Sequence, residues 1–322
     1  MKIAVVGCGA VGSYYGGRLA QAGHDVHFLL RSDYEVVRRN GVSVQSPRGS
    51  FHFHPRPAMA PNEIGPSDLV LIALKTTAND QFRVLLPPLV GPQTGVLTLQ
   101  NGLGNEELLA QLFGPEQVLG ALCFVCLNRI APGRILHLDH GQIVLGEFKG
   151  PPRDRTHRLA TAFREGGVPC EVTPDLARAH WEKLVWNIPF NGLGVAAAAG
   201  LEAVTSGTWD CARPLEPCLT TDRLLGHPDW AGLVRELMLE VIAAARGLGF
   251  DVSPSLADHL LNLTRSMGAY KASTLLDFER GQPMELESLF LEPLRRARAG
   301  RVPVPRLEKL CQVLRQLDEA RH

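Results

Sequence analysis

Residues 1–12 read Met1-Lys2-Ile3-Ala4-Val5-Val6-Gly7-Cys8-Gly9-Ala10-Val11-Gly12. The apolar run is followed directly by the pattern G-x-G-x-x-G, and the residues up to Ala22 have a helical composition that stops at Gly23. Glycine accounts for 32 of the 322 residues, so the pattern alone is weak evidence, and its position between a strand and a helix carries the information. This order predicts a β-strand, a tight turn and a helix over Ala10 to Ala22.

The three glycines of the pattern each have a physical role in binding a dinucleotide. Gly7 permits the tight turn, Gly9 lets the backbone approach a pyrophosphate, and Gly12 lets the helix pack closely on the strand. The free N–H groups and the positive dipole end of the helix then receive the phosphates. We therefore predict a Rossmann-type cofactor site on Gly7, Cys8, Gly9, Ala10, Val11 and Gly12. A glycine-rich turn in an unrelated α/β protein is the alternative.

The end of the second expected strand bears on the choice of cofactor. About 20 residues beyond the glycine motif, an NAD site places an acid on the ribose 2′-hydroxyl, but here the strand ends in Leu30-Arg31-Ser32. A guanidinium suits the 2′-phosphate of NADP through charge-assisted bonds, with Ser32 as a second donor. The sequence therefore favours NADPH, while Asp33 keeps NADH open, and Arg31 as an ordinary surface cation is the alternative.

Strand and helix signals divide the chain into two parts. From residue 1 to about 172, apolar β-branched runs alternate with helical patterns, which predicts an α/β domain with a doubly wound, mostly parallel sheet. After Pro174 strand signals nearly vanish, so we expect domains at 1–174 and 175–322, the second all-helical. An irregular segment is expected at Thr205 to His227. The expected strands are Lys2–Val6, Asp25–Leu30, Leu69–Leu74, Gly95–Leu99, Val118–Phe124 and Val168–Val172, with Arg134–His137 and Gln142–Leu145 as a hairpin.

Composition excludes several classes of protein. The 33 Lys and Arg residues balance the 33 Asp and Glu residues, so no global field attracts nucleic acid or anionic lipid, and a small-molecule partner is favoured. No uncharged stretch reaches the roughly 18 to 20 residues that span a bilayer, and we expect a cytoplasmic protein with reduced cysteines. Cys123 and Cys126 form a CxxC inside an apolar run, which favours buried thiols over a metal site, and we expect no metal.

Two loops follow expected strands of the parallel sheet. Lys75 comes after Leu71 to Leu74, and Asn101 comes after Leu97 to Leu99. Both loops lie at the carboxyl ends of strands, where such sheets bind ligands. Lys75 could then neutralise a phosphate or a carboxylate, and the amide of Asn101 could orient a nicotinamide or a substrate. Each is equally compatible with an ordinary polar residue at a strand end.

The second half has a polar stripe on an otherwise apolar helix. Lys183, Asn187 and Asn191 are spaced i, i+4, i+8, so they share one face, and their neighbours are apolar. A buried amine and two buried amides need hydrogen-bond partners or a wet cleft. A snorkelling lysine with two core amides is the alternative, and Pro189 is expected to kink the helix.

A second polar segment runs from Lys271 to Glu287. Gly281 and Pro283 break the chain there, and a new helix is expected to start near Glu285. A carboxylate at a helix start is electrostatically favourable even without a function.

These motifs together resemble the ketopantoate reductases (2-dehydropantoate 2-reductases) over nearly the whole chain. The resemblance implies a Rossmann domain, a helical second domain, and NADPH-dependent reduction of ketopantoate, a 2-oxo acid, to pantoate in pantothenate and coenzyme A synthesis. A homodimer is implied only by what is usual in the family. The motifs that match in order and spacing are Gly7 to Gly12, Leu74-Lys75-Thr76, Leu99 to Glu106, Lys183-Leu184 with Asn187 and Asn191, and Ser273 to Glu285.

The resemblance also implies roles for single residues. Lys183 matches the general acid that protonates the carbonyl oxygen, and Glu285 matches the glutamate that holds the substrate hydroxyl and positions the lysine. The remaining matches are Asn187 and Asn191 as substrate contacts, Ser273 as a donor to the substrate carboxylate, Asn101 as a substrate or cofactor contact, and Lys75 as a cofactor contact.

Two departures from the family pattern concern the substrate. Gly192 follows Asn191 where the family often has proline, and Thr274 stands where methionine is common. They keep open a paralogous NADPH-dependent reductase of another 2-oxo acid, a ketone or an imine. A third hypothesis, an NADPH-binding sensor or scaffold, is disfavoured by Lys183 and Glu285, because a binding module needs no proton donor.

Overall fold

Strand β1 (Lys2–Val6) lies in the interior of a ten-stranded sheet, because its side chains from Ile3 to Val6 are all apolar and at most 1% exposed. The computed structural model describes residues 1–321, which form two units divided between Ala179 and His180. The strands, all in the first unit, are β1, β2 (Asp25–Leu29), β3 (Val42–Gln45), β4 (Phe51–Phe53), β5 (Arg56–Ala58), β6 (Ser67–Ile72), β7 (Val90–Thr98), β8 (Val118–Ala131), β9 (Arg134–Glu147) and β10 (Cys170–Val172).

The parallel part of the sheet has the order of a dinucleotide-binding domain. Strands β5-β2-β1-β6-β7-β8 are neighbours in that order, and each pair is parallel. Counted along the chain, these six strands follow the 3-2-1-4-5-6 order of the doubly wound fold, which reverses beside the first strand. In register, Val5 of β1 lies between Phe28 of β2 and Leu71 of β6. The Rossmann-type sheet expected from the sequence is confirmed.

The expected hairpin between Arg134–His137 and Gln142–Leu145 is wrong. Both segments belong to the single strand β9, which pairs antiparallel with the long strand β8. The break in the apolar pattern comes from His140 and Gly141, whose φ angles are 62° and 122°, and the register of the pair shifts at this level. Strands β3, β4 and β5 were not expected, because three or four residues carry too little alternation to show a pattern.

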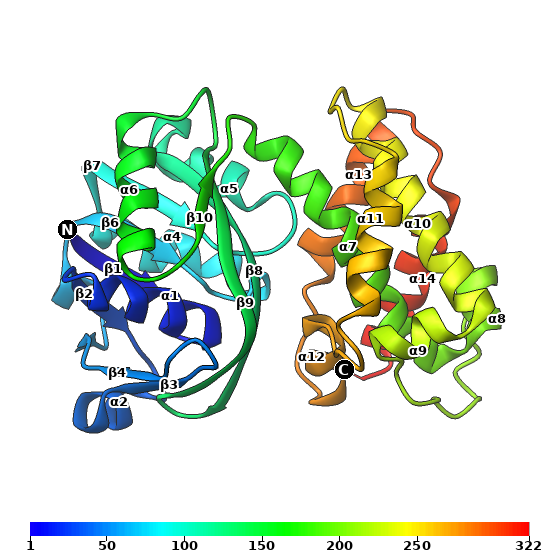
Figure 1. Cartoon of the computed structure of the whole chain (residues 1–322), viewed down its shortest axis with the longest axis horizontal. Helices are drawn as coiled ribbons and strands as arrows, with labels where there is room; N and C mark the ends of the chain where they lie inside the picture. Colours follow the sequence, from blue (N-terminus) through cyan, green and yellow to red (C-terminus); the bar gives the residue numbers. More distant parts are fainter. Residues whose placement is uncertain (322) are drawn as a thin grey trace. The chain divides into compact units, whose positions relative to one another are not determined.

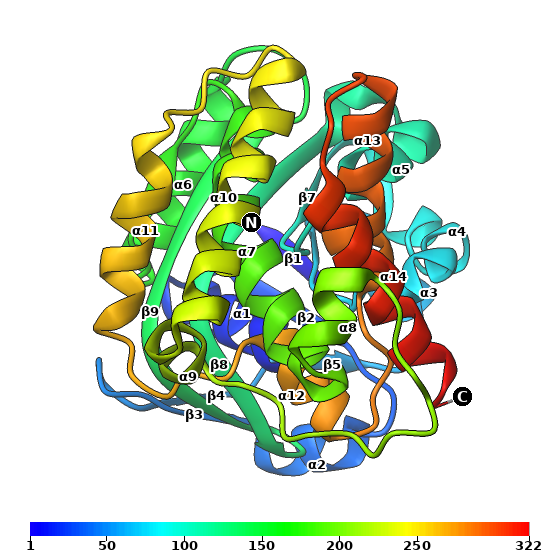
Figure 2. The same cartoon turned by 90° about the vertical axis from the view of Figure 1, so that its right-hand side faces the viewer.

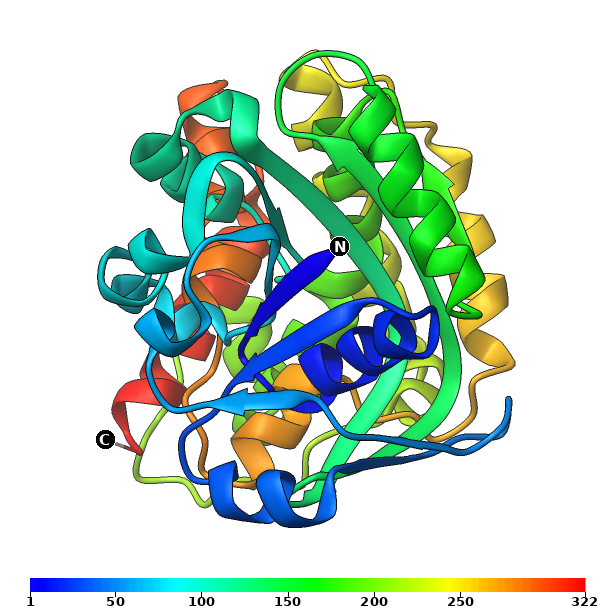
Figure 3. The same ribbon diagram turned by 90° about the vertical axis from the view of Figure 1, so that its left-hand side faces the viewer.

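Helix α1 (Ala10–Gln21) lies on the concave side of the curled sheet (Figure 3) and contacts strands β1, β2, β3, β4, β6, β8 and β9. Its small residues allow this, since a Cβ atom built on Gly16 or Gly17 would lie within 2.8 Å of Phe28 or Phe53. The Tyr15 hydroxyl donates to the Gly141 carbonyl at 3.3 Å. The other helices of this unit are α2 (Tyr34–Asn40), α3 (Pro61–Ile64), α4 (Phe82–Leu85), α5 (Asn105–Phe113) and α6 (Asp154–Glu165).

The second unit, drawn in yellow-green to red in Figures 1 and 2, has no strand among residues 180–321. Helix α7 starts at Leu176 and is buried on all sides beyond Asn187, as expected for a helix that is apolar all round. The helices are α7 (Leu176–Ala196), α8 (Leu201–Ser206), α9 (Thr221–Gly226), α10 (Pro228–Gly247), α11 (Ser255–Arg265), α12 (Ser273–Glu279), α13 (Glu292–Ala299) and α14 (Pro305–Glu319). No helix within residues 1–321 is long and apolar enough to cross a membrane.

The expected irregular segment, Thr205 to His227, is shorter in the structure. It runs between α8 and α9, and Thr221–Gly226 is helical. A tertiary contact explains the helix, because the Thr221 hydroxyl and amide donate to the carbonyls of Gly268 and Tyr270 at 2.7 and 3.1 Å. Local sequence could not show this anchor, which comes from more than 40 residues further along the chain.

The glycine turn yields a test of stability. A Cβ atom built on Gly12 would lie 2.2 Å from the Gly7 carbonyl oxygen, whereas a Cβ on Gly9 meets no atom within 4 Å. We expect Gly12→Ala to lower the free energy of unfolding by about 2 kcal/mol or more, because the backbone must move apart. Gly9→Ala, the matched control, should cost less than about 1 kcal/mol. Urea denaturation followed by circular dichroism measures both, and equal midpoints for Gly12→Ala and the wild type would contradict the steric argument.

Candidate functional site

The turn between β1 and α1 is shaped by close backbone contacts. Gly7 has φ 99°, and a Cβ atom there would lie 2.3 Å from the Leu74 amide nitrogen, at the end of β6. Gly9 is the N-cap of α1 and has no side-chain cap, while the Ser13 hydroxyl donates to the Cys8 carbonyl at 3.1 Å. The turn therefore brings the uncapped start of a helix to the reversal point of the strand order, with open space at Gly9.

Cys8 ties this turn to the end of the neighbouring strand. Its thiol approaches the carbonyls of Val5 and Leu29 at 3.5 and 3.4 Å. Burial, and secondarily the charge of Asp33, raises the pKa of Cys8 well above its ordinary value. The raised pKa disfavours the thiolate form that a nucleophilic cysteine needs.

The residues after β2 divide between the surface and the interior. Arg31 and Ser32 are exposed, and Asp33 is only 6% exposed at the start of α2. The Ser32 hydroxyl donates to Asp33 Oδ1 at 3.1 Å. Arg31 thus keeps a solvent-facing guanidinium, while Ser32 is engaged by its neighbour rather than standing ready as a second phosphate donor.

A network of amides joins the loops after β6 and β7. The Gln100 amide donates to the Leu74 carbonyl at 3.0 Å and to Asn79 Oδ1 at 2.8 Å, and the Asn79 amide donates to Asn105 Oδ1 at 2.9 Å. Asn105 in turn donates to the Asn101 carbonyl at 3.1 Å. The network fixes the loop that bears Asn101, which is half-buried. The sequence predicts a role only for Asn101 within the motif Leu99 to Glu106, and no pattern points to Asn79.

Lys75 is exposed and directly precedes a short 3₁₀ helix, η1 (Thr76–Gln81). It lies at the same edge of the parallel sheet as the glycine turn, where the strands end. The CxxC pair lies on β8, where Cys126 is buried and Cys123 is half-buried, and neither forms a disulfide. Within residues 1–321, no three side chains of the types His, Cys, Asp and Glu gather to hold a metal.

In the second unit, the polar stripe of α7 is buried with its apolar neighbours. Asn187 and Asn191 are 6% and 3% exposed, and Lys183 is half-buried. The helix is continuous through Pro189, and the Trp186 indole donates to the Thr264 hydroxyl of α11 at 2.9 Å. Amides this deep must be hydrogen-bonded or offered to a ligand.

The structure brings Asn191 together with Ser273, 82 residues further along the chain. Asn191 Oδ1 accepts the Ser273 hydroxyl at 3.2 Å and the Thr274 amide at 3.0 Å, so it caps the start of α12. Thr274, one of the departures from the family pattern, makes this contact with its backbone amide, which any residue except proline could supply, so the contact does not explain the threonine side chain. The other departure, Gly192, is a packing residue, because a Cβ there would lie 2.6 Å from Leu310.

Glu285 is 7% exposed and lies in the extended segment between α12 and the following helix. That helix opens with a π-helical turn, Glu287–Leu291, a feature frequent at functional sites. The expectation that a helix starts near Glu285 is confirmed, since the Leu289 amide donates to its carbonyl at 3.4 Å.

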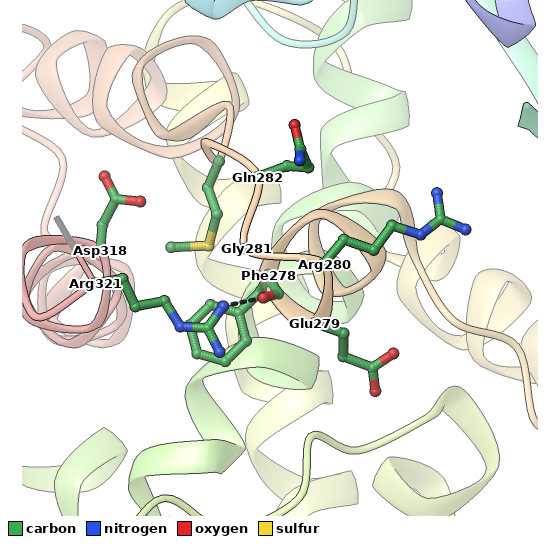
Figure 4. A pocket seen from close by; sticks show the side chains of 8 residues that line it. Phe278, Glu279, Arg280, Gly281, Gln282, Asp318 and Arg321 are labelled. Carbon is green, nitrogen blue, oxygen red and sulfur yellow. Dashed lines mark hydrogen bonds between the residues drawn. The ribbon is translucent and has the colours of Figure 1, made fainter. Parts of the chain in front are cut away.

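A cavity of about 410 Å³ lies beside the turn at Gly281 (Figure 4). Arg321 fills one side of it, donating to the Phe278 carbonyl with its guanidinium 3.4 Å from the centre of the Phe278 ring. Its described lining residues include neither Lys183 nor Glu285. We therefore do not assign it to the site built on α7.

Comparison with known proteins finds one family in both parts of the chain. The family described as Ketopantoate reductase PanE/ApbA matches residues 3–150, and the one described as Ketopantoate reductase PanE/ApbA C terminal matches residues 218–318. A 2-dehydropantoate 2-reductase of Nostoc sp. (strain PCC 7120) is 38% identical, with 98% of this chain and 95% of that protein covered.

Solved structures with the same fold carry the same name. A 2-dehydropantoate 2-reductase from Geobacter metallireducens GS-15 is 44% identical, with a TM-score of 0.89 over 98% of this chain and 99% of that one. Another from Methylococcus capsulatus is 33% identical, with a TM-score of 0.87 over 100% and 98% of the two chains. This chain therefore belongs to the ketopantoate reductase family, whose members are pyridine-nucleotide-dependent oxidoreductases that act on CH–OH groups.

Proposed function

We propose that this protein reduces 2-dehydropantoate to pantoate with NADPH, using Lys183 as the general acid. The observation that carries the proposal is the buried polar stripe on α7, in which Asn191 is held against Ser273 while Asn187 and Lys183 occupy the same helix face. The relatives named 2-dehydropantoate 2-reductase support the choice of substrate. On this proposal the reaction serves pantothenate and coenzyme A synthesis in the cytoplasm.

The glycine turn fits a dinucleotide. The space beside Gly9, where a Cβ would meet nothing within 4 Å, leaves room for a pyrophosphate, and the uncapped N–H groups of α1 can donate to it. Arg31 is the proposed partner of the 2′-phosphate, and Lys75 and Asn101 bind the cofactor from the loops after β6 and β7. A bound nicotinamide supplies the hydride.

Lys183 has the chemistry that carbonyl reduction needs. As hydride reaches the carbonyl carbon, negative charge develops on the carbonyl oxygen, and the lysine ammonium transfers a proton to it, so that an alcohol forms. A half-buried lysine strengthens that interaction because water competes less for the oxyanion. Glu285 is buried and lies two residues before the π-helical turn. It is the proposed partner of the substrate hydroxyl.

The contact between Asn191 and Ser273 indicates how these two residues divide their tasks. Asn191 Oδ1 already accepts two hydrogen bonds, so its amide N–H groups are what it offers to a substrate. The Ser273 hydroxyl has one proton, which points to Asn191, and binding a substrate carboxylate requires that proton to rotate toward it. Asn191 Oδ1 then loses the hydrogen bond from Ser273 but keeps the one from the Thr274 amide, so it still has a hydrogen-bond donor.

The substrate is tested by NADPH oxidation at 340 nm with purified protein and a panel of 2-oxo acids, ketones and imines. Rapid, saturable turnover of 2-dehydropantoate above the other compounds is expected. Turnover of a different carbonyl compound, with none of 2-dehydropantoate, would assign the protein to a paralogous reductase and keep the proposed acid. Binding of NADPH without turnover of any compound would favour the sensor.

The general acid is tested by Lys183→Ala. Loss of the proton donor should lower kcat/KM by about 10² to 10⁴ while the Kd for NADPH, measured by fluorescence titration, stays unchanged. Lys271→Ala is the matched control, since that lysine pairs with Glu279 at 2.7 Å at the surface of the same unit. A Lys183→Ala protein with wild-type turnover would remove the lysine from the mechanism.

The cofactor contact is tested by Arg31→Ala. Removing a charge-assisted bond to the 2′-phosphate should cost about 2 kcal/mol, or roughly thirtyfold in the Kd for NADPH, with little effect on NADH. Arg38→Ala, which removes an exposed arginine of α2 paired with Glu35, is the control. Equal weakening of both cofactors by Arg31→Ala would refute the phosphate assignment.

A further inference from the structure

Asp33 is held by an arginine from a distant part of the sheet. Arg129, near the end of β8, donates from Nε to Asp33 Oδ2 at 3.0 Å and from Nη2 to Asp33 Oδ1. The Asp33 side chain is 8% exposed and that of Arg129 is 42% exposed. The pair is bidentate, which is the strong geometry for a guanidinium and a carboxylate. It joins residues 96 positions apart in the chain.

The pair lies beside the candidate cofactor site. Asp33 is two residues beyond Arg31, and its charge is felt by Cys8 within the glycine turn. The Cys8 thiol in turn contacts the Leu29 carbonyl at the end of β2. This is the strand end at which an NAD-binding sheet presents an acid to the ribose 2′-hydroxyl. The chain therefore does have an acidic residue, Asp33, near this strand end, and its carboxylate is paired with the Arg129 guanidinium.

From this geometry we infer that Arg129 determines cofactor specificity, by occupying the Asp33 carboxylate so that a dianionic 2′-phosphate can bind beside Arg31. The inference rests on the proposed NADPH site and adds a residue to it. A free carboxylate there would repel the phosphate and offer itself to the 2′-hydroxyl of NADH. Arg129 acts through Asp33 and is a positioning residue, not a catalytic one.

A second ion pair of the same kind provides a control. Arg155 donates from Nε to Glu147 Oε1 at 2.9 Å and from Nη2 to Glu147 Oε2, and the Glu147 side chain is 1% exposed. Glu147 pairs in register with Leu119, at the opposite end of β8 from Arg129. Breaking either pair leaves a buried carboxylate, but only one of them lies beside the proposed phosphate.

The test measures the Kd for NADPH and NADH by fluorescence titration at pH 8, well above the ordinary pKa of a carboxyl group, and without any 2-oxo acid. Arg129→Gln should weaken NADPH at least about tenfold and leave NADH unchanged or tighter, because Asp33 becomes free. Arg129→Lys, which keeps the charge, and the double variant Asp33→Asn with Arg129→Gln, which removes the carboxylate, should both restore the preference for NADPH. Arg155→Gln should leave the ratio of the two Kd values unchanged.

Two results would overturn the inference while leaving the proposed function intact. One is equal weakening of NADPH and NADH by Arg129→Gln, and the other is a double variant that stays as weak as Arg129→Gln. If Arg129→Gln does not fold, the folded double variant decides by itself, since it removes both charges and must keep the wild-type preference. A wild-type protein that binds NADPH no tighter than NADH would refute the proposed cofactor and this inference together. Because no substrate is present, an error in the proposed substrate cannot imitate any of these results.

Discussion

No side chain fits at Gly7 or Gly12, and the first unit is built around that exclusion. Contacts of 2.2 to 2.3 Å for a Cβ at these positions mean that the turn after β1 touches both the start of α1 and the end of β6. The close approach seats α1 against the concave face of the sheet, where Gly16 and Gly17 let it meet Phe28 and Phe53. It also leaves the uncapped N–H groups of α1 at the point where the strand order reverses. One packing constraint thus produces both the fold of this unit and its ability to receive an anion.

The second unit uses burial in a different way. Helix α7 is apolar on all sides along most of its length, so its polar groups are isolated from water and carry a cost unless they are bonded. Asn191 meets that requirement by capping α12, which fixes Ser273 next to it. The same hydrogen bonds that make the buried amide tolerable therefore hold two candidate substrate ligands at a defined separation. The departure from the family pattern at Gly192 has a structural reason in helix packing, whereas the Thr274 contact uses the backbone amide and does not explain the side chain there.

Two buried carboxylates of the first unit, Asp33 and Glu147, are each paired with an arginine. Asp33 and Glu147 lie at opposite ends of the region covered by β8, and both accept a bidentate guanidinium. A buried carboxylate without a partner is strongly destabilising, so these pairs have a structural reason irrespective of function. At Asp33 we infer a further consequence of the same pairing, because it occupies the acid that would otherwise be free to select the cofactor. On this inference, Arg129 contributes both to stability and to cofactor specificity.

Local patterns alone predicted the strand, turn and helix of residues 2–21, the parallel strands β1, β2, β6, β7 and β8, the helical second half, and the polar residues on α7. These features depend on the periodicity of apolar residues and on the spacing of glycines within a short motif, and both are properties of residues that are neighbours in the chain. The β8–β9 pair, the short strands β3, β4 and β5, and helix α9 escaped prediction, because contacts with distant segments form them. The sequence is limited in the same way for the candidate site. It predicted Asn191 and Ser273 as separate substrate contacts, and Arg31, near Asp33, as a cofactor contact. Only the tertiary structure decided that Asn191 binds Ser273 and that Arg129 neutralises Asp33, because hydrogen bonds and ion pairs between residues 82 and 96 positions apart leave no periodic trace in the chain.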